Sequence, residues 1–430
     1  MEKAGELGPD GQDCFTDADQ PVKPKAGVSQ AGPLTALGSL YFIFGFITCL
    51  NDILVPHLKQ VFELNYARAM LIQLSFFSAY FIMSLPSGWL VDRVGYQKGM
   101  VAGLVTMAVG CVLFYPAAES QAYAMFLSAL FLLAAGITLL QVAANPLVAV
   151  LGPPETASSR LTLTQGFNSL GTTLAPLFGS ALILAGGGTT SVQLPYLGLA
   201  AALVALAGFT AWYPMPAPAP NPAAPGDSGD SGDSGADGPA SPWRHRPMLL
   251  GTIGIFLYVG AEVGIGSFLV NYLNQPGVAG IPLAQAARYV AFYWGGAMVG
   301  RFVGAGVMRL VPPPRVLFCN ALAAIALVLT AMAAHGRASM WAILAVGCFN
   351  SIMFPTIFTL AIKDLGKHMG QASGILCMAV VGGALVPLAQ GLLADWQGIR
   401  ASFALPVLCY AYIAFYGAAG HLPRPGKGGI

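Results

Sequence analysis

Charge is the property that this chain most conspicuously lacks. Of its 430 residues, 9% are Asp, Glu, Lys or Arg and 56% are hydrophobic, whereas soluble domains contain about 25% charged residues. Six of the 18 acids fall within residues 2–19 and four more within residues 227–237. The few that remain cannot cover a water-exposed surface, so the composition excludes an ordinary soluble protein.

Signatures of several chemical sites are also missing. The seven cysteines show no CxxC or other metal-ligand spacing, the five histidines are scattered along the chain, and no Walker loop occurs. No basic field suggests a nucleic-acid partner, and no nucleophile–base pair suggests an enzyme. We therefore expect no catalytic residues, no organic cofactor and no ATP-driven chemistry. The acidic, polar start of the chain also contains no apolar segment typical of a cleaved signal.

Long apolar runs fill the rest of the sequence, and a membrane-spanning helix needs about 20 such residues. The runs cover 34–57, 66–91, 98–117, 122–151, 160–185, 192–213, 247–273, 283–308, 315–334, 339–362, 370–393 and 399–420. Barrel strands are about 10 residues long and alternate in polarity, so continuous runs of this length exclude a transmembrane barrel. The sequence predicts an all-α membrane protein with twelve transmembrane helices in two bundles of six.

A polar interruption separates the two sets of six. Residues 214–246 begin with alternating prolines and contain three Gly-Asp-Ser repeats, so we expect a disordered linker. The predicted organisation is a disordered head (1–33), an N-terminal bundle (34–213), this linker, a C-terminal bundle (247–420) and a short tail (421–430).

The basic residues are distributed unevenly between the two membrane sides. If the N-terminus is cytoplasmic, 14 of the 20 Lys and Arg residues lie on the cytoplasmic side and five in the outer loops. Cytoplasmic loops are enriched in positive charge. The head, the linker and the tail are therefore predicted to be cytoplasmic.

The two halves repeat a polar pattern. Gln141 lies five residues before Pro146 in the fourth run, and Asn350 lies five residues before Pro355 in the tenth. Two equivalent bundles that face each other form a cleft near the middle of the membrane, which is the arrangement that alternating access uses.

Two acids lie well inside apolar runs, Asp52 in the first and Glu262 in the seventh. Charged residues inside a membrane are costly and usually functional. Asn51 and Thr48 would add neutral oxygens beside Asp52, so this group is a candidate cation-coupling site with a ligand set suited to sodium. The alternative for each acid is a structural pair with a buried donor.

Uncharged polar side chains mark a candidate substrate pocket. Gln141 and Asn145 share one helix face, as do Gln165 and Asn168 on the next helix. The candidate substrate-binding residues are Gln141, Asn145, Gln165, Asn168, Asn271, Trp294, Asn350 and Gln390. Amides both donate and accept hydrogen bonds, which suits sugar hydroxyls, and Trp294 offers a flat face. Helix–helix hydrogen bonds and aromatic packing are the alternatives. Asn271 is out of phase with Glu262 and joins the pocket only if the helix breaks near Gly264 or Gly266.

Arg301 lies about two turns from the cytoplasmic end of its run, where a gate or packing role is expected.

Between the second and third runs, Gly88-Trp-Leu-Val-Asp92-Arg93-Val-Gly95-Tyr-Gln-Lys98 resembles the loop signature of the major facilitator superfamily. This resemblance implies the major facilitator fold and places Asp92 and Arg93 at the cytoplasmic gate.

Further segments resemble one branch of that superfamily. They are Leu50-Asn51-Asp52-Ile-Leu-Val-Pro56-His57, Gln141-Val-Ala-Ala-Asn145-Pro146, Gln165-Gly-Phe-Asn168-Ser-Leu-Gly171, Gly260-Ala-Glu262-Val-Gly-Ile-Gly266-Ser-Phe-Leu-Val-Asn271 and Phe349-Asn350-Ser-Ile-Met-Phe-Pro355-Thr. They are similar to the fucose permease and glucose/galactose transporter branch of bacterial sugar symporters. The fucose/proton symporters have an acid matching Asp52, a Glu in place of Gln141 and a Gln in place of Glu262. Loss of the carboxylate at position 141 shifts our expectation slightly from a proton towards sodium.

We therefore expect a monomeric transporter of the bacterial inner membrane that imports a monosaccharide with sodium or a proton. Glucose or galactose is the first choice of substrate and an N-acetylated hexosamine the second. The alternatives are an exporter of amphipathic compounds, whose pocket should be more apolar, and a non-transporting membrane receptor for sugars.

Overall fold

The computed structural model describes residues 31–61, 66–179, 193–213 and 242–422. All regular elements in these ranges are helices. The N-terminal half contains α1 (Ala31–Val61), α2 (Tyr66–Val94), α3 (Tyr96–Ser120), α4 (Tyr123–Val150), α5 (Ala157–Gly179) and α6 (Gln193–Trp212). Nearly all of the expected head and linker, and most of the tail, lie outside the described residues.

The C-terminal half begins with three continuous helices, α7 (Arg246–Asn274), α8 (Leu283–Val307) and α9 (Pro313–Ala333). The last three spans are built from pieces. They are α10 (Gly336–Asn350) with α11 (Met353–Ile362), α12 (Met369–Met378) with α13 (Gly382–Gln397), and α14 (Ile399–Ser402) with α15 (Ala404–Phe415) and a final π-helical turn. The described residues thus form twelve helical spans, which confirms the predicted fold class.

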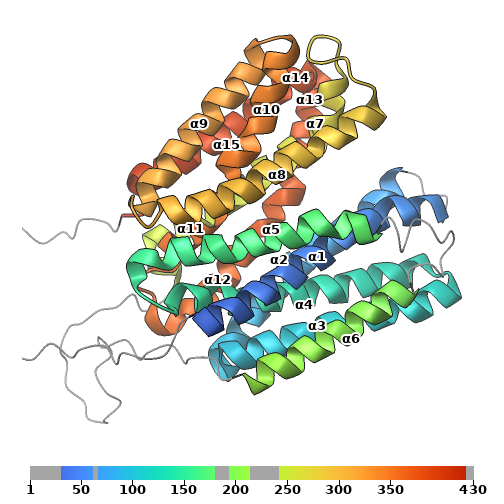
Figure 1. The fold of residues 1–430 in the computed structure, drawn as a ribbon, viewed down its shortest axis with the longest axis vertical. Coiled ribbons are helices and arrows are strands. Elements are labelled where there is room, and N and C mark those ends of the chain that lie inside the picture. The colour runs from blue at the N-terminus through green and yellow to red at the C-terminus, as the bar shows by residue number, and fades with distance from the viewer. Residues whose placement is uncertain (1–30, 62–65, 180–192, 214–241, 423–430) are drawn as a thin grey trace, which may run out of the picture.

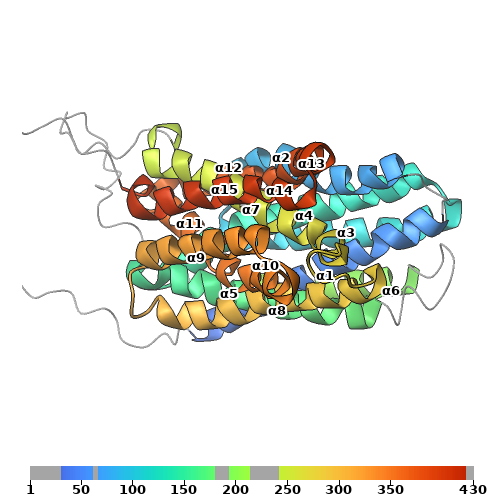
Figure 2. The ribbon, with the colours of Figure 1, turned by 90° about the horizontal axis from the view of Figure 1, so that it is seen from above.

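The spans form two bundles that lie side by side (Figures 1 and 2). Helix α2 packs against α12 of the other bundle, and α5 packs against α8 and α11. In Figure 1 the two bundles are close together on the left, where α1 begins and α15 ends, and they diverge towards the right. We name the end of the bundles at which α2 finishes with Asp92 and Arg93 and α12 begins the inner end, and the opposite one the outer end.

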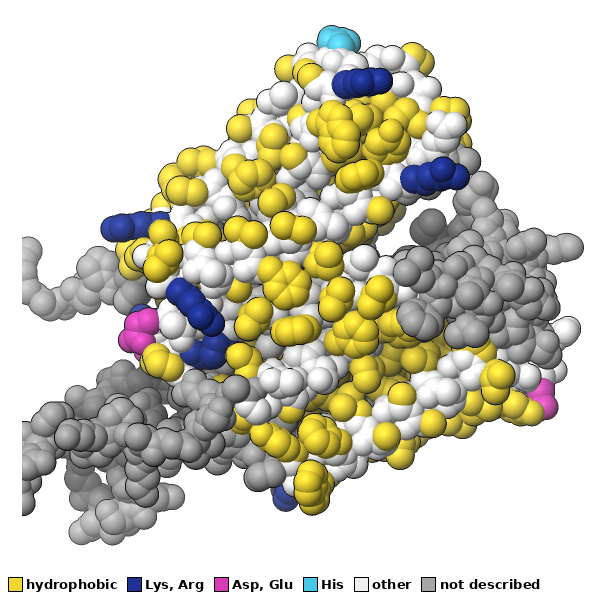
Figure 3. All heavy atoms as spheres, viewed as in Figure 1, with side chains coloured by type: hydrophobic (Ala, Val, Ile, Leu, Met, Phe, Trp, Pro, Cys, Tyr) yellow, Lys and Arg dark blue, Asp and Glu magenta, His cyan; other side chains and the backbone are white. Residues whose placement is uncertain are grey.

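The exterior matches a lipid environment. Ten segments of the described residues are long and apolar enough to cross a membrane, and α5 and α8 are not among them. Because α5 and α8 pack against each other between the two bundles, their polar residues can face protein. Figure 3 shows hydrophobic side chains over the middle of one face and charged side chains towards its two ends. The molecule is a multi-pass membrane protein.

Close helix packing inside each bundle depends on glycine at specific positions. A side chain at Gly45 of α1 would overlap the backbone carbonyl of Asn168 on α5, and one at Gly171 of α5 would overlap the carbonyl of Phe42 on α1. The two backbones therefore touch, and this contact fixes the position of Asn168.

We expect Gly45→Val to lower the thermal unfolding temperature of the purified protein strongly, because overpacking at a backbone contact costs about 3 kcal/mol. Gly198→Ala on α6 is the matched control. Beyond the backbone of its own helix and its chain neighbours, no described atom lies within 4 Å of a carbon added at Gly198. Ala is favoured over Gly inside a helix by roughly 0.5–1 kcal/mol. A Gly45→Val protein as stable as the control would contradict this close packing.

Candidate functional site

Amide side chains of the N-terminal half are held by two tyrosines. Gln141 on α4 donates from Nε2 to the hydroxyl of Tyr80 on α2 at 3.2 Å. One turn further on α4, Asn145 accepts a hydrogen bond from the hydroxyl of Tyr41 on α1. Asn168 of α5 donates to the backbone carbonyl of Tyr41 at 3.2 Å. Helices α1, α2, α4 and α5 thus bring these amides into one polar group.

The C-terminal half repeats this arrangement. Asn350 on α10 donates to the hydroxyl of Tyr293 on α8 at 2.8 Å, and that hydroxyl donates to the backbone carbonyl of Glu262 on α7 at 3.2 Å. In both halves, an amide that lies five residues before a proline bonds a tyrosine on the equivalent neighbouring helix. The sequence repeat therefore corresponds to a repeat in three dimensions.

The two prolines also supply hydrogen-bond acceptors. Proline has no N–H, so Pro146 leaves the carbonyl of Val142 without its helical donor, and Pro355 does the same for Ser351. The Ser373 hydroxyl of α12 donates to the Val142 carbonyl at 2.9 Å, and Arg301 Nε donates to the Ser351 carbonyl at 3.4 Å. The first of these bonds joins the two halves.

Arg301 lies where α7, α8 and α5 meet. Its Nη2 is 3.8 Å from Oε1 of Glu262, and its Nη1 donates to the hydroxyl of Ser169 on α5. The side chains of Arg301 and Glu262 are 14% and 11% exposed. Glu262 thus has the buried donor that was the structural alternative for an intramembrane acid.

The two halves are also closed together at the inner end. The carboxylate of Asp92, at the end of α2, accepts the backbone N–H groups of Gly370 at 3.0 Å and Gln371 at 3.1 Å, in the first turn of α12. An acid at this position also interacts favourably with the helix dipole. The Arg93 guanidinium stacks on Trp89 at 5.1 Å from the ring centroid. In the first turn of α5, Ser158 bonds the hydroxyl of Thr359 at 2.6 Å.

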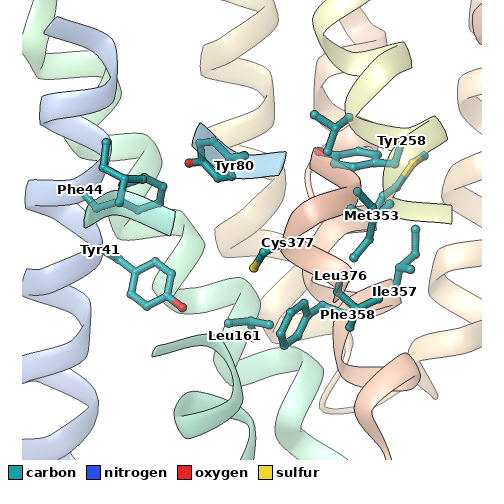
Figure 4. Packing of buried hydrophobic residues seen from close by; sticks show 14 of the residues in the cluster. Tyr41, Phe44, Tyr80, Leu161, Tyr258, Met353, Ile357, Phe358, Leu376 and Cys377 are labelled. Atoms are coloured by element: carbon teal, nitrogen blue, oxygen red, sulfur yellow. The ribbon is translucent and has the colours of Figure 1, made fainter. Parts of the chain in front are cut away.

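Apolar side chains cover the centre of the same interface. In Figure 4, Cys377 of α12 lies between Tyr41 and Tyr80 on one side and Leu376 and Phe358 on the other. Cys377 is fully buried. Apolar side chains of both halves thus pack together beside Tyr41 and Tyr80.

The space beside these amides is small. A cavity of about 10 Å³ is lined by Leu40, Tyr41, Phe44, Leu140, Gln141 and Ala144, which is close to the minimum for one water molecule. A larger hollow of about 460 Å³ lies between α2, α3 and α4 and is lined by Ser75, Leu113, Leu127, Ser128, Phe131 and Leu132. It contains none of the candidate amides.

Several predicted site residues lie apart from the amide group. Gln390 of α13 is fully buried against Gly264 of α7, and neither of its amide atoms has a hydrogen-bond partner. Trp294 packs against Gly266. Helix α7 is continuous from Arg246 to Asn274, so the break that would bring Asn271 into the pocket does not occur, and Asn271 is exposed.

The candidate cation-coupling group is only partly visible. Thr48 donates from Oγ1 to the carbonyl of Phe44 at 2.9 Å, which leaves its oxygen lone pairs free to accept. Asn51 and Asp52 lie on α1, but their side chains are outside the described residues. Gln165 is buried on α5, one turn before Ser169, whose hydroxyl donates to the carbonyl of Gln165 at 3.1 Å. No group of three or more His, Cys, Asp or Glu that could hold a metal occurs in the part of the chain that the structure describes.

Sequence reasoning missed the partners of the polar residues. Tyr41 looked like one aromatic residue among many, although it bonds Asn145. Ser169 also escaped notice, although its position four residues after Gln165 places it on the same helix face. Tyr258 and Tyr410 were missed as well, and their buried hydroxyls belong to the electrostatic surroundings of Glu262.

Comparisons with known proteins agree with this architecture. A family model described as Major Facilitator Superfamily matches residues 37–380. The chain is 55% identical over 394 residues to a glucose/galactose transporter of Brucella abortus, which covers 90% of this chain and 93% of the relative. It is 44% identical over 406 residues to a putative glucose/galactose transporter of Helicobacter pylori, with 90% and 96% covered.

A solved structure of the Escherichia coli fucose:proton symporter has a TM-score of 0.82 to this fold at 32% identity, with 91% of this chain and 99% of that chain covered. A second structure of that symporter, in the outward conformation, also has a TM-score of 0.82 at 33% identity. The closed inner end described above is in keeping with an outward conformation.

Proposed function

The chain belongs to the Major Facilitator Superfamily, and we propose that it imports a glucose- or galactose-like hexose with a cation across the bacterial inner membrane. One observation carries this proposal, the 55% identity to a glucose/galactose transporter along 90% of the chain. Transport by alternating access follows from two equivalent bundles whose inner ends are closed together in this state.

The geometry supports a sugar as the substrate. Gln141 and Asn168 of the N-terminal bundle and Asn350 of the C-terminal bundle each carry a donor and an acceptor. Hexose hydroxyls need both kinds of partner, whereas an amphipathic compound needs apolar walls. The amides are therefore the proposed sugar ligands, together with Gln165.

Cation coupling is assigned to Asp52. Glu262 already lies at ion-pair distance from Arg301, so it is a poor carrier of a second positive charge. Asp52 and the free lone pairs of Thr48 remain as the proposed cation ligands. Gln141 in place of a carboxylate favours sodium, while the similarity to a fucose:proton symporter supports a proton.

Uptake of radiolabelled sugar into proteoliposomes tests the function. We expect accumulation of glucose or galactose when an inward cation gradient is imposed, and none when the gradient is abolished with an ionophore. Empty liposomes are the control. Binding of sugar without accumulation would indicate a receptor, and transport of amphipathic compounds alone would indicate an exporter.

Replacement of a proposed ligand should weaken sugar binding. Gln165→Ala is expected to raise the dissociation constant about 5- to 150-fold, because loss of a buried hydrogen-bond partner costs about 1–3 kcal/mol. Isothermal titration with the sugar measures this change. Gln193→Ala, at the outer end of α6 where the amide lies 3.4 Å from the Tyr115 carbonyl, is the matched control and should bind normally. Equal affinity in the two variants would remove Gln165 from the site.

A further inference from the structure

Arg301 connects both halves of the transporter, and its hydrogen bonds are distributed unevenly. Nη1 donates across the interface to the Ser169 hydroxyl, and Nε donates within its own half to the Ser351 carbonyl. Glu262, the only acid paired with Arg301 among the described residues, is merely at ion-pair distance, 3.8 Å from Nη2.

One oxygen of the Glu262 carboxylate is left without a hydrogen bond in this arrangement. Glu262 Oε1 is buried and has no hydrogen-bond partner. Hydrogen bonds between charged groups are roughly twice as strong as neutral ones, so a direct N–H bond from Arg301 to Oε1 would be favourable. In the closed state, however, the guanidinium directs its hydrogen bonds to Ser169 and Ser351 instead.

Two neighbours of Arg301 belong to its own half. The Ser351 carbonyl has no helical donor because Pro355 lacks an N–H. The Tyr293 hydroxyl donates to the backbone carbonyl of Glu262 at 3.2 Å. Ser169 belongs to the other half and must move away from α8 when the inner end opens. Opening would then leave a buried guanidinium with one hydrogen-bond partner fewer, which is costly.

We propose that Arg301 acts as a latch that exchanges Ser169 for Glu262 during inward opening. With the inner end closed, Arg301 binds Ser169 of the opposite half. With it open, Arg301 binds Glu262 directly, so that the carboxylate compensates the lost contact. Arg301 and Glu262 are positioning residues of the transport cycle in this proposal, which rests on the alternating access of the proposed function.

The latch also lies next to the proposed sugar ligands. Ser169 follows Asn168 on α5 and lies one turn after Gln165, while Ser351 follows Asn350 on α10. Sugar bound to these amides would draw α5 and α10 together around Arg301. Occupancy of the sugar site and the state of the latch are therefore expected to influence each other.

Loss of Ser169 and loss of Glu262 as partners of Arg301 should shift the equilibrium between the closed and open states in opposite directions. Ser169→Ala weakens the closed state and Glu262→Gln weakens the open state, each by about tenfold, the effect of one hydrogen bond to a charged group. Labelling of Cys377 by a permeant maleimide, read by mass spectrometry, reports opening because this thiol is fully buried where the halves meet. We expect faster labelling in Ser169→Ala and slower labelling in Glu262→Gln.

Controls separate the latch from general loss of packing. Ser158→Ala removes another hydroxyl contact between the halves, 2.6 Å to Thr359, and should speed labelling equally in wild-type and Arg301→Gln backgrounds. Ser169→Ala should have no effect in the Arg301→Gln background, and Ser169→Thr should restore normal labelling. Cys111, buried inside the N-terminal bundle, serves as the internal reference. If Arg301→Gln does not fold, Arg301→Met, which also lacks the guanidinium donors, replaces it.

Two outcomes would overturn the latch. One is a shift of Cys377 labelling in the same direction by Ser169→Ala and Glu262→Gln, and the other is an additive effect of Ser169→Ala in the Arg301→Gln background. Because labelling requires no sugar, either result can be separated from a failure of the proposed function, which would appear as absent uptake by the wild-type protein.

Discussion

Asp92→Ala is expected to reduce sugar uptake at least tenfold and to speed the labelling of Cys377. The carboxylate accepts two backbone N–H groups at the start of α12, at 3.0 and 3.1 Å, across the two halves. Each is a hydrogen bond to a charged group, although partial exposure of Asp92 to solvent reduces its strength. Without them the inner end loses its cap, and the closed state required for loading from outside becomes less populated.

The measurement is the initial rate of uptake in proteoliposomes together with the labelling of Cys377. Asp92→Asn keeps one acceptor oxygen and should fall between the wild type and Asp92→Ala. Asp395→Ala is the matched control, because Asp395 is an exposed acid near the opposite end of its span. Normal uptake and unchanged labelling in Asp92→Ala would show that the cap does not hold the closed state.

The succession of spans could be read from the sequence because lipid imposes a simple rule. Backbone polar groups in a membrane must bond internally, so each apolar run of sufficient length becomes a helix. The runs at 98–117 and 283–308 correspond closely to α3 and α8. The break between α10 and α11 was not anticipated. Pro355 removes one helical N–H there, but Pro146 does the same in α4, which stays continuous.

The candidate site could be predicted only in part. Polar residue types and helix phase selected Gln141 and Asn350, but a sequence does not show which side chain lies opposite. The hydrogen bonds of these amides to Tyr80 and Tyr293 could therefore not be predicted, and neither could the bond from Arg301 to Ser169. Gln390 was selected by the same reasoning, yet it lies buried against Gly264, because the close approach of α7 and α13 depends on packing of several helices.

The depth of each acid in the membrane was harder to predict from the sequence than its helix. Asp52 and Glu262 lie on equivalent helices, but not at equivalent levels. The backbone carbonyl of Phe42 on α1 contacts Gly171 of α5, and that of Phe256 on α7 contacts Gly382 of α13 in the same way. Asp52 follows Phe42 by ten residues and Glu262 follows Phe256 by six, so Asp52 is displaced by about 6 Å towards the outer end. This offset fits different roles for the two acids.

The coupling ion can be identified by comparing sugar accumulation under a sodium gradient with accumulation under a pH gradient. Because Gln141 leaves α4 without a carboxylate at this position, we expect a sodium gradient at fixed pH to drive sugar accumulation. A pH gradient without sodium should then drive none. Accumulation under the pH gradient alone would instead assign the proton and contradict the preference for sodium.

Asp52→Asn is expected to abolish accumulation under the sodium gradient, with a loss of about a hundredfold or more. The amide cannot carry the negative charge that balances the driving cation, and burying an unbalanced cation in the membrane costs several kcal/mol. Sugar binding and exchange across a membrane without a gradient should survive, because the proposed amide ligands are intact.

Glu262→Gln is the matched control: it removes the charge of the acid already paired with Arg301, so it should slow accumulation without abolishing it. Full accumulation by Asp52→Asn would remove Asp52 from the coupling mechanism, whereas loss of exchange as well as accumulation would show that Asp52 shapes the sugar site itself.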